Sequence, residues 1–190
     1  MRSEIKSPGS RNEPGERSTT LENATATDSI IPDTHAAIEF LKKWSPENVV
    51  VLTAIIPDGI TETCTFKPSE MEKAAEWIES HQGKRNLYFH VNAVRRALTN
   101  KASKEDIARM AWLHVDVDPR AGEDFDEERD RALKVLRDYE KQPTVIIDSG
   151  GGFQGFWKLE PSEKLEINGE IAKAQELEAY NQQLEKLFQG

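Results

Sequence analysis

Hydrophobic and polar residues follow short periods along most of this chain, and these periods predict strands. The run VVVLTAII at 49–56 consists of β-branched and apolar residues, whereas ITETCTF at 60–66 alternates, as a half-exposed strand does. The intervening Pro-Asp-Gly sequence favours a tight turn, so the two runs predict a hairpin. Further strand-like runs lie at 86–91, 112–118, 143–149 and 153–159.

Three helices are predicted before residue 111. The first predicted helix begins at Asp33 or Thr34, either of which can cap it. The second opens with a capping box spaced as Ser69–Glu72 and ends near Gly83. A third, short helix is predicted over 104–110.

Two longer helices are predicted in the second half of the chain. The helix at 124–139 carries an inner stripe of Leu133, Leu136 and Tyr139, and the helix at 171–188 has Leu177, Leu184 and Leu187 as its apolar contacts. The order of strands and helices is irregular and does not repeat a strand–helix–strand unit. It therefore predicts an α+β fold, with a mixed or antiparallel sheet and flanking helices.

Residues 1–32 differ in composition from the rest of the chain. They consist largely of Ser, Thr, Glu, Gly, Pro and Asn and hold almost nothing able to fill a core. Burial of apolar surface would therefore not offset the chain entropy lost on ordering. We expect a disordered N-terminal tail at 1–32 and one folded domain at 33–190.

Composition excludes several classes of protein. The 190 residues carry a net charge of −9, which argues against a uniformly basic nucleic-acid coat. The single cysteine excludes a disulfide framework and a CxxC zinc site. No apolar run approaches the ~18 residues of a membrane span. We therefore expect a cytoplasmic protein without a membrane partner.

The segment WLHVDVDP at 112–119 contains the strongest candidate chemistry. Alternation in a strand places His114, Asp116 and Asp118 on the face opposite to three aliphatic side chains. Two carboxylates at this spacing, with Cα atoms roughly 6.5–7 Å apart, can share one divalent ion or bridge two, as in phosphoryl transfer. Hard oxygen ligands of this kind favour Mg²⁺ or Mn²⁺. The alternative is an edge strand with a solvated polar face.

A glycine-rich turn follows the strand at 143–149. Its backbone N–H groups can approach an anion closely, and neighbouring side chains add a hydroxyl, an amide and an ammonium. We therefore predict a nucleotide-phosphate site made of Ser149, Gly150, Gly151, Gly152, Gln154 and Lys158. The alternative is a loose hairpin linker, because the turn lacks the GxxxxGK[ST] pattern of a P-loop.

Basic residues concentrate in the segment 84–109. It contains seven basic and two acidic side chains, a local net charge of +5. Such a patch can contact several phosphates in a salt-sensitive manner. The predicted nucleic-acid-binding residues are Lys84, Arg85, Arg95, Arg96 and Lys101, and the alternative is a solvated basic face.

Four segments, NLYFHVN, KASKEDIARM, WLHVDVDPR and VIIDSGGGFQGFWKL, together resemble a known family in their order and spacing. They are similar to the RepB-like primase-polymerase domains of phages and plasmids, which belong to the archaeo-eukaryotic primase superfamily. The resemblance implies an RRM-like catalytic core in which Asp116 and Asp118 hold the catalytic metals. It also implies that Ser149 and Gln154 contact the triphosphate, with Gln where the family more often has His.

The resemblance further implies an activity and its partners. The expected activity is nucleotidyl transfer from NTP or dNTP on a single-stranded DNA template. The resemblance leaves open whether a helicase domain or protein works with this chain. The family's third acidic motif would follow the last helix, beyond Gly190. Residues 33–190 are therefore expected to be a C-terminally incomplete domain.

Two alternatives from other classes remain. The first is a non-catalytic nucleic-acid-binding module, which is either part of a replication initiator or a decayed primase. The second is a metal-dependent phosphotransferase that is unrelated to primases.

Overall fold

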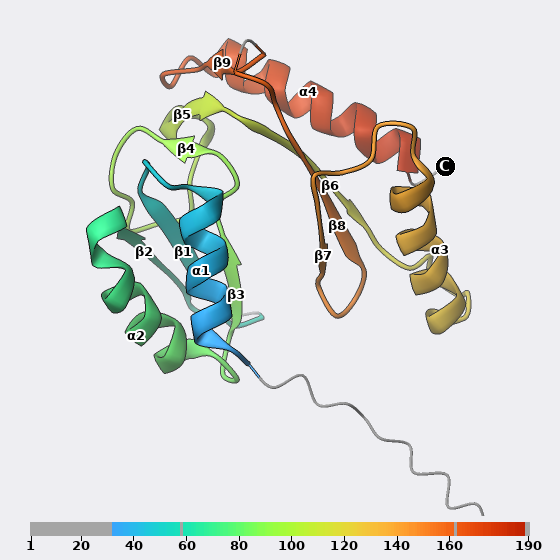
Figure 1. Ribbon diagram of the computed structural model, residues 1–190, viewed down its shortest axis with the longest axis horizontal. Coiled ribbons are helices and arrows are strands. Elements are labelled where there is room, and N and C mark those ends of the chain that lie inside the picture. Colours follow the sequence, from blue (N-terminus) through green and yellow to red (C-terminus); the bar gives the residue numbers. More distant parts are fainter. Residues whose placement is uncertain (1–31, 58, 162, 189–190) are drawn as a thin grey trace, which may run out of the picture. The chain divides into compact units, whose positions relative to one another are not determined.

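The computed structural model describes residues 32–188 except for positions 58 and 162. Apart from Pro32, the predicted tail lies outside the described residues. The described part has an α+β fold with four α-helices and small antiparallel sheets (Figure 1). Within it, no helix combines the length and the apolar character needed to cross a bilayer.

The first sheet has the strand order β2-β1-β3 and confirms the predicted hairpin. Val50 pairs with Phe66 at the open end of this hairpin. Helices α1 and α2 pack on the sheet through a core that includes Ile38, Leu52 and Ile78. The bounds are α1 Thr34–Trp44, β1 Val50–Ile55, β2 Thr61–Phe66, α2 Met71–His81 and β3 Asn86–Phe89.

The start of each helix in this part follows from its local hydrogen bonds. Asp33 caps α1, because its carboxylate accepts from the backbone N–H of Ala36 (2.9 Å). The capping box predicted at Ser69–Glu72 is wrong. A 3₁₀ turn over Pro68–Glu70 precedes α2, and the carboxylate of Glu70 accepts from the backbone N–H of Lys67 (3.1 Å).

The short helix predicted over 104–110 is also wrong. Only Lys104–Asp106 forms a 3₁₀ turn, closed by the Asp106 carboxylate, which accepts from the Ser103 N–H and hydroxyl. Residues Ile107–Met110 form strand β5, between β4 (Ala93–Val94) and β9 (Leu165–Glu166). Pairing with two strands that are distant in sequence overrides the local helical preference.

The third sheet, of order β6-β8-β7, carries the predicted site. Helix α3 packs on one face, where Leu136 and Ala132 meet Val115 and Val117. Helix α4 contributes Phe188 to this core, whereas the predicted contact Leu187 is wrong, since its side chain is 55% exposed. The bounds are β6 Trp112–Val117, α3 Phe125–Asp138, β7 Val145–Asp148, β8 Phe153–Lys158 and α4 Ile171–Phe188.

An aromatic cluster covers the middle of the opposite face of this sheet. The indole of Trp112 on β6 stacks on that of Trp44 at the end of α1, with ring centroids 3.9 Å apart and planes 8° apart. Phe156 on β8 meets Trp44 edge-on at 5.1 Å. Because Trp44 also contacts Phe89 on β3, one cluster ties the third sheet to the first.

Candidate metal and nucleotide site

Asp116 and Gln154 lie directly opposite each other in the β6–β8 ladder. Residues directly opposite in an antiparallel pair project on the same side of the sheet, so both belong to the face of the aromatic cluster. Val115 and Val117 point to the other face and are each 1% exposed. The predicted alternation along this strand is therefore present, and Asp118 follows directly after its last residue.

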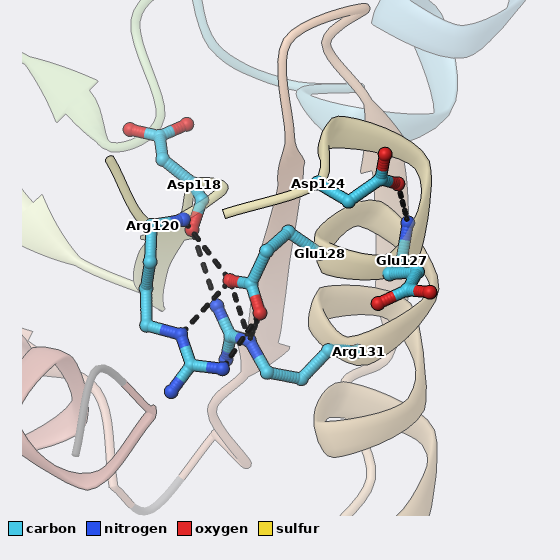
Figure 2. A network of polar contacts seen from close by, with 6 residues as sticks. All are labelled: Asp118, Arg120, Asp124, Glu127, Glu128 and Arg131. Atoms are coloured by element: carbon cyan, nitrogen blue, oxygen red, sulfur yellow. Dashed lines mark hydrogen bonds and ion pairs between the residues drawn. The ribbon is translucent and has the colours of Figure 1, made fainter. Parts of the chain in front are cut away.

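The carboxylates of Asp116 and Asp118 are exposed, and no basic side chain of the described residues pairs with them. In the described part of the chain, neither the Asp116 nor the Asp118 side chain forms a hydrogen bond or an ion pair. Figure 2 shows the Asp118 carboxylate directed away from the guanidinium groups of Arg120 and Arg131. Both groups therefore remain available as hard oxygen ligands.

A complete protein cage for a metal does not form around this pair. Among the described residues, no group of three or more His, Cys, Asp or Glu side chains gathers in a way that could hold an ion. Two carboxylates alone suit an ion that keeps several waters or substrate phosphates as its other ligands, as Mg²⁺ does.

The glycine turn and the aspartates meet at Gly152. A Cβ atom at this position would lie 2.5 Å from the Val117 carbonyl oxygen and 2.7 Å from Asp118 Oδ1. Only glycine permits this close approach of the two chains. The structure thus brings Asp116, Asp118, Gly152 and Gln154 together.

The turn closes largely on itself. The Ser149 hydroxyl donates to the Gly152 carbonyl (3.0 Å) and accepts from the Gly152 N–H (3.2 Å). The Gly150 N–H donates to Asp148 Oδ1 (2.8 Å). Of the three glycine amides, only that of Gly151 lacks a partner in the described chain, so the turn as folded offers a smaller anion cradle than the sequence predicts.

Arg129 on α3 holds the turn from the other side. Its guanidinium donates to the Gly150 carbonyl and to Asp148 Oδ2, both at 2.8 Å, and lies over the Phe153 ring at 4.8 Å. The Gly150 N–H and this guanidinium lower the pKa of Asp148 from its ordinary value. Asp148 pairs with Phe153 on the α3 face of the sheet, so it does not join Asp116 on the opposite face.

A buried carboxylate anchors the chain just after Asp118. Glu128 is 4% exposed and accepts from the backbone N–H of Arg120 (3.0 Å) and from its guanidinium (2.7 Å). It also pairs with Arg131 (2.8 Å), which in turn donates to the Asp118 carbonyl (3.3 Å), as Figure 2 shows. These contacts, the Arg120 hydrogen bonds first, lower the pKa of Glu128 to about 2.

Lys158 lies apart from this group. In the ladder it pairs with Trp112, four positions along β8 from Gln154, which is about 13–14 Å of strand. Its ammonium sits 5.7 Å from the centre of a Trp112 ring. Phe156, only 2% exposed, stands between the two positions on the same face.

His114 shares the Asp116 face but bonds elsewhere. Its Nδ1 lies 3.2 Å from the side-chain nitrogen of Asn181 on α4, and its ring stacks on Phe156 at 6.0 Å. Burial lowers its pKa, with the charge of Asp116 acting in the opposite direction.

Most predicted nucleic-acid-binding residues have partners within the protein. Arg85 pairs with Glu62 (2.8 Å) and Arg96 with Asp106 (2.8 Å). Two others bond backbone carbonyls, Arg95 that of Asn168 and Lys84 that of Ser80. Of the five, Lys101 alone is exposed with no partner in the part of the chain that is described.

Sequence reasoning missed Arg120, Glu128, Arg129 and Arg131. The only local signal was the spacing of Glu128 and Arg131, which are neighbours on one helix face.

No protein-family model matches this chain, and neither a curated protein nor a solved structure matches it.

Proposed function

We propose that this chain binds a nucleoside triphosphate together with Mg²⁺ or Mn²⁺ and acts in nucleotidyl transfer on a single-stranded DNA template. The proposal takes the site to be that of a RepB-like primase-polymerase working in the cytoplasm. A single observation carries it. Asp116 and Gln154 face each other in the β6–β8 ladder, and Asp118 lies against Gly152 at the end of this strand pair, with both carboxylates unpaired in the described chain.

The donor set fits the metal. Two exposed carboxylates with hard oxygen atoms suit Mg²⁺ or Mn²⁺ completed by water and phosphate oxygens. When bound, such an ion lowers the pKa of an attacking hydroxyl and neutralises charge on pyrophosphate.

The protein groups around the carboxylates have separate tasks. The Gln154 side-chain amide, opposite Asp116, donates a hydrogen bond to a phosphate oxygen but adds no positive charge. The Gly151 N–H provides a second donor. In the reaction, a 3′-hydroxyl gives up its proton to water and its oxygen forms a bond to the α-phosphorus while the bond to pyrophosphate breaks. These donors hold the triphosphate in line.

Two carboxylates without a third acidic partner among the described residues make a weak site. We therefore expect weak binding of the metal alone, tighter binding of the metal with a triphosphate, and slow or no strand extension. Efficient template-directed synthesis by this chain would contradict the expectation of an incomplete site.

A non-catalytic nucleic-acid-binding module is the second candidate. The self-closed turn favours it, because Gly150 and Gly152 already use their amides within the protein. The basic residues of 84–109 would then bind DNA, and the aspartates would have no role in binding.

Binding of a fluorescent dNTP, followed by anisotropy with and without Mn²⁺, tests the proposed function. We expect Mn²⁺-dependent binding that Asp116→Asn weakens by about tenfold or more, since it removes a direct ligand. Asp130→Asn is the matched control, because Asp130 is an exposed α3 carboxylate with the same charge. The proposal would be overturned if dNTP binding did not depend on Mn²⁺, or if Asp116→Asn and Asp130→Asn changed the dNTP affinity equally.

A further inference from the structure

A cleft of about 480 Å³ opens between β3, β6 and α4. This volume falls within the range of small-molecule sites. His90 lines it just beyond β3, His114 lines it from β6, and Asn181 lines it from α4. We name this cavity the His90–His114 cleft.

Helix α4 lies along the free edge of β6 and fixes the orientation of one imidazole. The His114 backbone N–H donates to Asn181 Oδ1 (3.2 Å), so the Asn181 amide nitrogen faces His114 Nδ1 (3.2 Å). That nitrogen is a donor only, so Nδ1 accepts and the proton of neutral His114 resides on Nε2. His114 thus keeps an N–H donor without a partner among the described residues.

The second imidazole has the opposite arrangement. His90 Nδ1 lies 2.6 Å from the carbonyl oxygen of Asn92, which can only accept, so Nδ1 carries the proton. His90 Nε2 then offers a lone pair, again without a partner in the described chain. Burial lowers the pKa of His90 and favours this neutral form. The cleft therefore contains one unused donor and one unused acceptor.

The charges around the cleft disfavour an anion. Lys104 is already paired with Glu178 (2.7 Å), and Glu185 adds a further carboxylate to the wall. Phe89 and Leu177 supply apolar surface. A neutral planar heterocycle with its own donors and acceptors suits these walls better than a phosphate does.

We propose that the His90–His114 cleft binds the nucleobase of a nucleotide whose phosphates reach the Asp116–Asp118 end of β6. His114 and Asp116 are two residues apart on one strand face, roughly 6.5–7 Å between Cα atoms. A base and its phosphates therefore have separate positions along the same strand. The identification of the ligand as a nucleotide rests on the proposed function, whereas the cleft itself does not.

Titration calorimetry with the eight common ribo- and deoxyribonucleosides, without metal, tests the cleft separately. Gln182→Trp places a large ring at the cleft, while Gln183→Trp alters the next exposed residue of α4, which does not line it. We expect at least one nucleoside to bind. Gln182→Trp and His90→Ala should each weaken that binding by about tenfold or more, and Gln183→Trp should not.

The outcomes separate the two proposals. Nucleoside binding without any Mn²⁺-dependent triphosphate binding would support the cleft and overturn the proposed function. Mn²⁺-dependent triphosphate binding that Gln182→Trp does not change, with no nucleoside binding at millimolar concentration, would overturn the cleft alone. Nucleoside binding that survives both cleft variants would also overturn it.

Discussion

The carboxylate of Asp118 lies over Gly152, so close that a Cβ atom there would come within 2.7 Å of Asp118 Oδ1. This contact joins the end of β6 to the start of β8. The position of the Asp118 side chain therefore depends on glycine, which has no side chain, at position 152.

Replacement of Gly152 by alanine is therefore expected to displace Asp118. We predict that Gly152→Ala weakens Mn²⁺-dependent dNTP binding by about tenfold or more, as loss of a positioning contact at a metal site does. Gly151→Ala is the control, because a Cβ atom at Gly151 meets nothing within 4 Å. Equal binding by the two variants would show that the close approach does not position Asp118.

Acid should weaken the fold through two buried carboxylates. The pKa of Asp106 falls from 3.8 to about 2, chiefly through hydrogen bonds from Ser103, and that of Glu128 falls from 4.5 to about 2, chiefly through Arg120. A folded-state pKa below the unfolded value stabilises the protein above the unfolded pKa, and this stability is lost as pH falls toward the folded pKa. We therefore predict a melting temperature that declines between about pH 4.5 and pH 2.

The variant Glu128→Gln should melt at a lower temperature than wild type at pH 7 and lose less on acidification. Melting curves followed by circular dichroism at several pH values provide the measurement. Parallel pH profiles for the two proteins would exclude Glu128 as a source of the acid sensitivity.

The stacked pair Trp44 and Trp112 should hold the first and third sheets in one cooperative unit. Both indoles are nearly buried, at 8% and 6% exposed. We predict that Trp44→Ala lowers the free energy of unfolding by about 3–5 kcal/mol, as removal of a buried aromatic ring does. Urea denaturation measures this change, and a loss below about 1 kcal/mol would mean that the stack contributes little.

Lys101 should contribute more to DNA binding than Arg96, which Asp106 already pairs. If Lys101 contacts one phosphate of single-stranded DNA, Lys101→Ala should reduce the slope of log K against log salt by about 0.7. Lys73→Ala is the control, because that exposed lysine pairs with Glu70. An unchanged salt dependence in Lys101→Ala would remove Lys101 from the interface.

Local patterns were sufficient for part of the fold. Alternation along 112–117 correctly assigned Val115 and Val117 to the core face and Asp116 to the other, because strand periodicity is a property of the backbone itself. The sequence offered Asp33 and Thr34 as caps of the first helix, and Asp33 is the cap, through a hydrogen bond that spans only three positions.

Errors arose where distant segments decide the structure. Strand β5 pairs with β4 and β9, and Ile167 and Asn168 donate to the Ala108 carbonyl from far along the chain. Leu187 and Phe188 are both apolar, so periodicity alone did not show which one reaches the α3 core. The pairing of Glu128 with Arg120 depends on the loop geometry after β6, which has no local signature.

The position of bound Mn²⁺ tests the central claim most directly. In NMR spectra of the isotope-labelled chain with dNTP, sub-stoichiometric Mn²⁺ should broaden the amide signals of Asp116, Asp118 and Gln154 before all others, and Asp116→Asn should abolish this order. Early broadening at the acidic first turn of α3 instead, unchanged in Asp116→Asn, would contradict a metal-bound nucleotide at the two aspartates.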